Sequence, residues 1–137
     1  MTSTVVYKGS LRTEMTHLQS GTVVETDAPK DNHGLGEKFS PTDLVASALG
    51  ACMLSIMGIA GKTHEIDVDG ASVEVEKIMF ADPQRRIGEI KIGFHFPKEK
   101  KYNDKQQKIM EHAAMTCPVF LSLSHELKKT VDWYWNL

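Results

Sequence analysis

The sequence predicts an α+β fold, because segments with the two-residue period of β-strands alternate with segments that carry helical signals. The strands are expected in pairs, at residues 4–18 and 22–27 and again at residues 71–80 and 87–96. The whole order is ββ-α-ββ-α-α-β. This order favours antiparallel hairpins with helices packed against them.

The first pair of strands is expected to turn at Ser20-Gly21, and Ala28-Pro29 closes its second strand. Gly9 interrupts the apolar pattern of the first strand. A loop over residues 30–39 then leads to the first helix. The second pair of strands shows the cleaner alternation, with Ile90, Ile92, Phe94 and Phe96 on one face.

A long helix is expected to begin at Ser40-Pro41-Thr42-Asp43. Serine is favoured at the N-cap and proline at the first helical position, and an acidic third residue suits both a capping box and the helix dipole. Apolar residues surround almost the whole helix as far as about Gly61, which predicts burial on every side. One short chain covers such a helix with difficulty, so this pattern favours a homodimer with central helices between sheets; a well-covered monomer is the alternative.

The last third of the chain contains two further helices and a strand. An amphipathic helix is expected over residues 103–115, with Ile109, Met110 and Ala113 on its inner face. Cys117-Pro118 opens a short helix that ends at Ser124 or Leu127, and residues 130–135 form a final strand.

Size and charge favour one folded domain over residues 1–137. Lys and Arg number 16 and Asp and Glu number 18, so the formal net charge is −2, which argues against a nucleic-acid partner. The N-terminus lacks a signal-peptide pattern, and the apolar stretch from Leu44 to Ala60 is shorter than the roughly 20 residues of a membrane span. A cytoplasmic protein that does not bind membranes is therefore expected.

The two cysteines are too few for a disulfide scaffold and lack the spacing of a zinc site. Cys52, inside the long helix, is either an ordinary small core residue or a thiol that needs a nearby cation to react. Cys117 is expected at the N-cap of the short helix, where backbone amides and the dipole would stabilise a thiolate; a plain capping role is the alternative. On these grounds Cys117 is predicted to be the more acidic thiol.

Arg12, on the first strand, is the candidate cation for Cys52, although a solvated surface arginine is the commoner role. No histidine pair has metal-ligand spacing, so neither a metal nor another cofactor is expected. The histidines are His17, His33, His64, His95, His112 and His125. The chain has no phosphate-binding glycine loop, GxSxG elbow or HExxH motif, so any chemical site is expected to depend on thiols.

Two motifs resemble those of the OsmC/Ohr family of thiol-dependent hydroperoxide reductases. Residues 40–52, SPTDLVASALGAC, are similar to the central-helix motif of that family, and Cys117-Pro118-Val119 is similar to its C-terminal CPV motif. The spacing of the cysteines and the order of elements also fit, so the resemblance covers nearly the whole chain.

The resemblance implies an OsmC-like fold, an intertwined homodimer in which antiparallel sheets wrap around long buried helices. It also implies that Cys52 attacks a peroxide, that Cys117 resolves the product, and that Arg12 holds the attacking thiolate. In the organic-hydroperoxide branch a glutamate at the third motif position orients the arginine. Here that position is Thr42, followed by Asp43, which are the candidate orienting residues.

The activity that the resemblance implies is the reduction of organic hydroperoxides or hydrogen peroxide in oxidative stress defence, with an external dithiol as reductant. Met53, Met57 and Phe120 are expected to line an apolar pocket for the hydroperoxide. The absent glutamate favours an alternative, a dimer that binds a small apolar or thiol-reactive molecule without turnover. A structural domain with unreactive thiols is a third interpretation.

Overall fold

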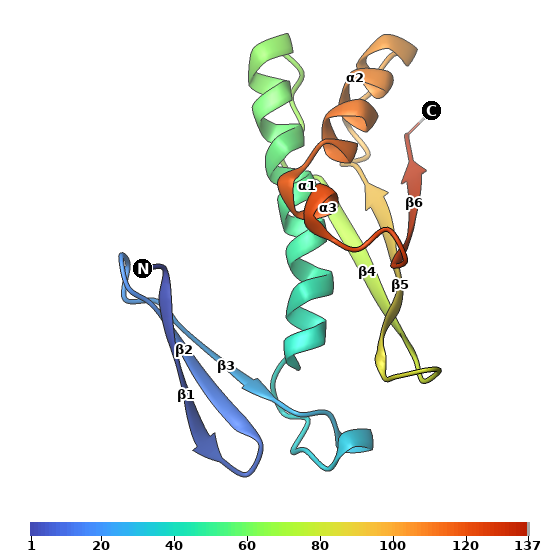
Figure 1. The fold of residues 1–137 in the computed structure, drawn as a ribbon. Coiled ribbons are helices and arrows are strands. Elements are labelled where there is room, and N and C mark those ends of the chain that lie inside the picture. The colour runs from blue at the N-terminus through green and yellow to red at the C-terminus, as the bar shows by residue number, and fades with distance from the viewer. Residues whose placement is uncertain (137) are drawn as a thin grey trace. The chain divides into compact units, whose positions relative to one another are not determined.

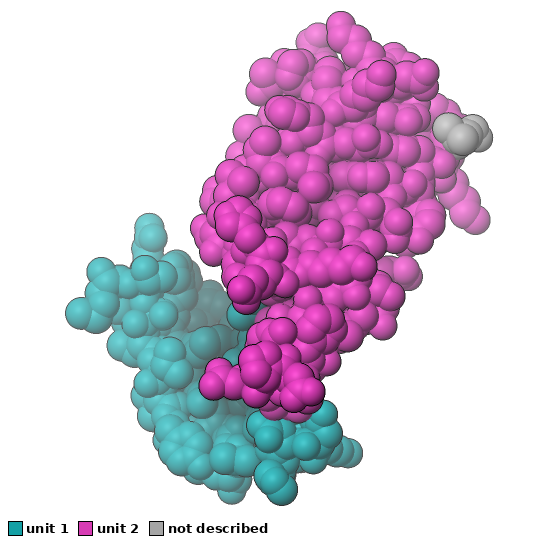
Figure 2. All heavy atoms as spheres, turned by 45° about the vertical axis from the view of Figure 1, so that its right-hand side comes forward, with its two compact units in different colours: residues 1–45 teal, residues 46–137 magenta. Residues whose placement is uncertain are grey.

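The computed structural model describes residues 1–136 and divides the chain into two compact units. The first unit spans residues 1–45 and the second begins at Ala46 (Figure 2). Each unit has its own three-stranded sheet, and the long helix α1 starts in the first unit and continues in the second. The two units are therefore described separately.

The sheet of the first unit is an antiparallel meander in the order β1-β2-β3 (Figure 1). Its strands are β1 (Ser3–Gly9), β2 (Arg12–His17) and β3 (Val23–Asp27). The expected single strand over residues 4–18 is wrong, because the chain reverses at Ser10 and Leu11. Both residues adopt the left-handed region, with φ of 54° and 60°, as a two-residue hairpin turn requires. Neither residue type is typical of such a turn, so only Gly9 signalled it.

Apolar side chains of this sheet remain uncovered in the described chain. Val5, Val6 and Tyr7 of β1 are 61%, 52% and 63% exposed. Val23 in β3 is also exposed. A short 3-10 turn, η1 (Lys30–Asn32), lies in the loop that leads from β3 to the long helix.

The long helix α1 (Pro41–His64) starts where the sequence predicts. The amide of Ser40 donates to Asp43 Oδ2 over 2.9 Å, and the amide of Asp43 donates to Ser40 Oγ over 3.0 Å. This reciprocal capping box satisfies two amides that have no partner within the helix. The helix runs three residues beyond the predicted end, and Glu65, with φ of 56°, takes the left-handed position that usually calls for glycine.

The second unit contains the strands β4 (Ser72–Phe80), β5 (Arg86–His95) and β6 (Lys128–Tyr134), in the order β4-β5-β6. The predicted β4–β5 hairpin is antiparallel, as expected. β6 pairs parallel to β5, a direction that the sequence pattern did not indicate. The connection through α2 (Asp104–Met115) and α3 (Pro118–Ser122) supplies the long crossover that a parallel pair needs.

The core of the second unit lies between α1 and this sheet. Gly50 permits a close approach to β4, since a Cβ atom there would lie 2.9 Å from Val73 Cγ2. Ile90, Ile92 and Phe94 of β5 are buried, as their alternation predicts. Phe94 stacks on Trp133 of β6 with ring centroids 4.3 Å apart.

Burial of α1 is one-sided in the described chain, whereas the sequence predicts burial all round. The buried positions recur at helical spacing: Ala46, Leu49, Gly50, Met53, Met57 and Gly61. Val45 and Ile59, outside this stripe, are 39% and 61% exposed. The chain alone therefore leaves apolar helix surface in contact with solvent.

Replacement of the capping serine tests the contribution of the box. Ser40→Ala should lower the free energy of unfolding by about 1 kcal/mol, because the Asp43 amide loses its acceptor. Urea denaturation measures this loss. Thr63→Ala is the control, since exposed Thr63 lies in the last turn and donates only to a carbonyl that the helix already uses. It should change stability by less than about 0.5 kcal/mol, and equal losses in both variants would contradict the assigned cap.

Candidate functional site

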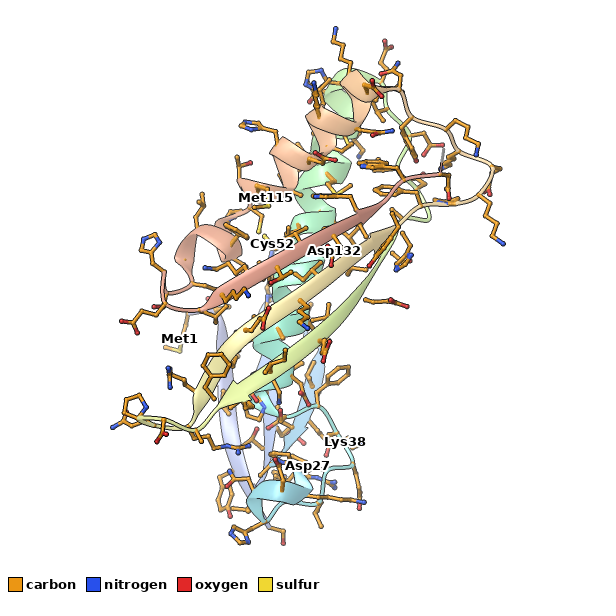
Figure 3. All side chains as sticks on the ribbon, turned by 90° about the vertical axis from the view of Figure 1, so that its right-hand side faces the viewer. Met1, Asp27, Lys38, Cys52, Met115 and Asp132 are labelled. Atoms are coloured by element: carbon orange, nitrogen blue, oxygen red, sulfur yellow. The ribbon has the colours of Figure 1, made fainter. Side chains whose placement is uncertain are left out.

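The two cysteines lie in the second unit and differ in exposure. Cys52 is half-buried on α1, where Figure 3 labels it. Cys117 has no exposed surface and occupies the N-cap of α3, with Pro118 at the start of the helix. Both are free thiols. One thiol is thus accessible to a small molecule and the other is not.

The structure brings these two thiols together. Cys52 lies near enough to Cys117 to help raise the pKa of the Cys117 thiol, although 64 residues separate them in the chain. The packed helix α1 carries the first thiol, and the turn between α2 and α3 carries the second. A disulfide between two thiols requires their Cα atoms to lie roughly 4.4–6.8 Å apart.

The N-cap position of Cys117 is confirmed, but its predicted acidity is wrong. Burial raises the pKa of the Cys117 thiol, and the neighbouring Cys52 adds to this effect. The Phe120 amide donates to Cys117 Sγ over 3.2 Å and opposes the rise without reversing it. A helix of five residues does not offset the loss of water around the sulfur. Cys117 is therefore held as a neutral thiol at neutral pH.

Arg12 lies in the first unit, where carboxylates hold its guanidinium. Nε donates to Asp27 Oδ1 over 2.7 Å, and Nη2 donates to Asp27 Oδ2 over 2.8 Å and to Glu37 Oε2 over 3.1 Å. Glu25 lies at 3.9 Å. These contacts raise the pKa of Arg12 and hold the pKa of Asp27 below its usual value. Arg12 is thus a charged side chain in a defined orientation.

Asp27 is a residue that the sequence reasoning missed. Its side chain has no exposed surface, and it also accepts a hydrogen bond of 3.1 Å from the backbone amide of Glu37. The backbone of neighbouring Lys38, which Figure 3 labels near Asp27, helps to lower the pKa of this carboxyl group. Asp27 is the cross-strand partner of Arg12 in the β2–β3 register. The turn between His17 and Val23 sets this register, and the sequence located that turn only approximately, at Ser20-Gly21, without counting which residues pair across it.

The candidate orienting residues Thr42 and Asp43 take part in the start of α1. Asp43 belongs to the capping box, and Thr42 Oγ1 lies 3.1 Å from Ser40 Oγ. Of the predicted pocket residues, Met53 and Met57 are fully buried in the core, and Phe120 is half-buried against it. A pocket formed by these three side chains stays a prediction.

A metal site is not found within residues 1–136, where no three His, Cys, Asp or Glu side chains gather around one point. One cavity of the second unit lies between the end of α1 and α2. It is lined mostly by apolar atoms, with His64, Lys105, Lys108 and His112 among its side chains. These residues are distinct from the thiol pair.

Comparison with known proteins identifies the family. A family model described as OsmC-like protein matches residues 34–132. The chain belongs to the OsmC-like protein family. This confirms the resemblance seen in the two cysteine motifs, and the mixed α+β architecture confirms the predicted fold class.

Solved structures resemble the chain over nearly its whole length. An osmotic stress and detoxification response protein, as it is described, from Psychrobacter arcticus is 47% identical, with a TM-score of 0.92 and coverage of 98% of this chain and 96% of that one. An organic hydroperoxide resistance protein OsmC from Legionella pneumophila has 15% identity and a TM-score of 0.76, covering 97% and 96%.

A third structure, an organic hydroperoxide resistance protein from Elizabethkingia anophelis with thiocyanate bound, has 16% identity and a TM-score of 0.73, covering 99% and 97%. At such low identity the last two structures show the fold alone. None of the curated proteins compared with this chain matches it significantly.

The family also explains the character of α1. By length and composition alone this helix could cross a membrane, with a mean hydropathy of 2.0 over its most apolar window. Core helices of soluble proteins have the same properties, and α1 packs its buried stripe against the second sheet. It is the core helix of a soluble OsmC-like fold.

Alkylation of Cys117 tests the effect of burial. In a Cys52→Ala variant, the reaction of Cys117 with iodoacetamide should have a pH midpoint above the ordinary thiol value of about 8.5, because burial disfavours the thiolate. Since the native pKa is raised, stability from the neutral thiol is present below the ordinary pKa and is lost as pH rises above it. The same protein in denaturant is the control, and a native midpoint at or below the denatured one would contradict the burial argument.

Proposed function

We propose that this protein is a thiol-dependent peroxidase that reduces organic hydroperoxides, or hydrogen peroxide, through Cys52 and Cys117 in oxidative stress defence. The observation that carries the proposal is the pairing of an accessible thiol with a buried one. Membership in the OsmC-like family supports it, as do neighbours named organic hydroperoxide resistance proteins. The pair offers the two sulfur atoms that a disulfide-forming reduction needs.

The reaction proceeds in three balanced steps. The Cys52 thiolate attacks the terminal oxygen of the hydroperoxide, the O–O bond breaks, and the alkoxide leaves as an alcohol after taking a proton. Cys52 is now a sulfenic acid. The Cys117 sulfur then attacks Cys52, and the thiol proton leaves with the hydroxyl group as water. An external dithiol reduces the resulting disulfide by two electrons and returns both thiols.

The exposure of each thiol suits its proposed role. Half-buried Cys52 can be reached by a peroxide, while fully buried Cys117 is shielded from competing oxidation. The raised pKa of Cys117 keeps it protonated, so that it can donate a hydrogen bond to a Cys52 thiolate. Arg12 is proposed to stabilise that thiolate by its charge and to polarise the peroxide.

The working form is proposed to be a cytoplasmic homodimer built from one OsmC-like domain per chain. Two observations support a second copy: apolar side chains of β1 are uncovered, and α1 is apolar on a face that this chain leaves exposed. Surfaces of this kind mark protein interfaces. A partner chain that covers them would complete the burial that the helix composition calls for.

A binding protein without turnover is the second candidate. The observation that favours it is the pairing of Arg12 with two carboxylates, Asp27 and Glu37, which offset its positive charge. In such a protein the thiols would recognise a thiol-reactive or small apolar molecule. Peroxide consumption separates the two candidates.

Stoichiometric cumene hydroperoxide tests the enzyme. In the reduced protein, mass spectrometry should show a Cys52–Cys117 disulfide, and a dithiol should restore both thiols. Cys117→Ser should stop at a Cys52 sulfenic acid that dimedone traps, while Cys52→Ser should not react. Arg12→Ala should slow the oxidation by about 10²–10³-fold, the usual cost of removing one charge-stabilising group.

The controls separate enzyme chemistry from general thiol oxidation. Glu99→Gln, which removes an exposed carboxylate in the loop before α2, should react as the wild type does. Two free thiols after treatment, under conditions that oxidise a known thiol peroxidase, would refute the peroxidase proposal. Oxidation with the wild-type rate in Arg12→Ala would remove Arg12 from the mechanism.

A further inference from the structure

We propose that Asp27 is the positioning residue for Arg12, in the place of the helix glutamate that this sequence lacks. Asp27 lies at the end of β3, directly opposite Arg12 in the β2–β3 register, and not on α1. The inference rests on the proposed function, because it assigns a role to Arg12 at Cys52. It identifies the carboxylate that this particular chain uses.

The geometry of the ion pair supports the role. Two parallel hydrogen bonds, of 2.7 and 2.8 Å, join the Nε and Nη2 edge of Arg12 to both oxygens of Asp27. Bidentate pairs fix the plane of a guanidinium as well as its position. Among residues 1–136 no hydrogen bond from Arg12 Nη1 is found, so the donors of that nitrogen are directed away from the ion pair.

Burial and backbone contacts make Asp27 a rigid support. Its carboxylate has no exposed surface and accepts a hydrogen bond from the backbone amide of Glu37 besides the two from Arg12. A buried charge with this many partners cannot leave its place without a large energetic loss. The orientation of Arg12 is therefore set by the β-sheet itself.

Glu37 contacts the same guanidinium but differs from Asp27 in burial and in the number of hydrogen bonds. Its carboxylate is 63% exposed and makes one hydrogen bond, of 3.1 Å, to Nη2. An exposed single contact contributes little orientation, while its charge still opposes a nearby thiolate. Glu25, at 3.9 Å from Arg12 Nε, is the other acidic group facing the guanidinium. Removal of Asp27 and removal of Glu37 are therefore expected to shift the pH midpoint of Cys52 alkylation in opposite directions.

The test measures the pH midpoint of Cys52 alkylation in a Cys117→Ala background. If charge alone mattered, removal of either carboxylate would leave Arg12 less neutralised and would lower the midpoint. Positioning predicts that Asp27→Asn raises the midpoint, because the guanidinium is no longer held in one orientation. Glu37→Gln should lower it. Glu99→Gln is the control that should leave it unchanged.

Oxidation rates give a second readout in chains that retain Cys117. Asp27→Asn should slow oxidation by cumene hydroperoxide by about 100-fold, the scale of a misplaced catalytic group. Glu37→Gln should accelerate it by about two- to fivefold, the scale of one exposed charge contact. In an Arg12→Gln background the effect of Asp27→Asn should disappear, because Asp27 acts only through Arg12. A loss that persists there would overturn the proposal, as would a lowered or unchanged midpoint in Asp27→Asn.

A second variant keeps the test decisive if Asp27→Asn fails to fold. Arg12→Lys retains the positive charge but cannot form two parallel bonds with one carboxylate. A raised midpoint and a slower oxidation in this variant would agree with positioning, and wild-type values would overturn it. A wild-type protein that hydroperoxide does not oxidise would refute the peroxidase, while the alkylation midpoints would still decide the role of Asp27.

Discussion

The packing of α1 against the second sheet is the constraint on which the rest of the second unit depends. Gly50 brings the helix so close to β4 that a methyl group at this position would collide with Val73. This contact fixes the rotation of the helix, and therefore the side of α1 from which Cys52 projects two residues later. Met53 and Met57 fill the interior on the same helix. A reactive thiol on a firmly packed helix has a defined position, which a thiol on a loop would lack.

The environment of each sulfur follows from its supporting element. Cys52 keeps some exposed surface because it lies at the edge of the buried stripe of α1. Cys117 loses all of its exposed surface because the turn between α2 and α3 returns the chain to the core. Arg12 is held in a separate framework, a β-ladder in which a buried carboxylate is the cross-strand neighbour. Thiol chemistry and charge are thus organised by different parts of the chain.

Much of the fold was predictable because its signals are local. The capping box at Ser40 and Asp43, the Cys117-Pro118 helix start and the alternation in β5 each depend on neighbouring residues only. The hairpin at Ser10 and Leu11 was missed because neither side chain is typical of the left-handed conformation that it adopts.

The site was predictable in its residue types and less so in its energetics. The motifs identified both cysteines, and the structure brings them together. The pKa of Cys117 was assigned in the wrong direction because helix capping is visible in a sequence and burial of one atom is not. Asp27 was missed for a related reason, since its pairing with Arg12 depends on the exact register of β2 and β3, which the predicted position of the turn between them did not fix.

The parallel pairing of β6 with β5 has a consequence for the order in which the protein is assembled. Lys128 pairs with Glu89, so this ladder closes only after the intervening chain, which includes Cys117, has been synthesised. Pairings between distant segments form late, because the connecting chain must lose its freedom before any contact is gained. A growing polypeptide therefore exposes Cys52 well before its buried neighbour arrives. A reaction that needs both Cys52 and Cys117 is therefore possible only after the whole chain has folded. On the ribosome, the incomplete chain presents Cys52 alone.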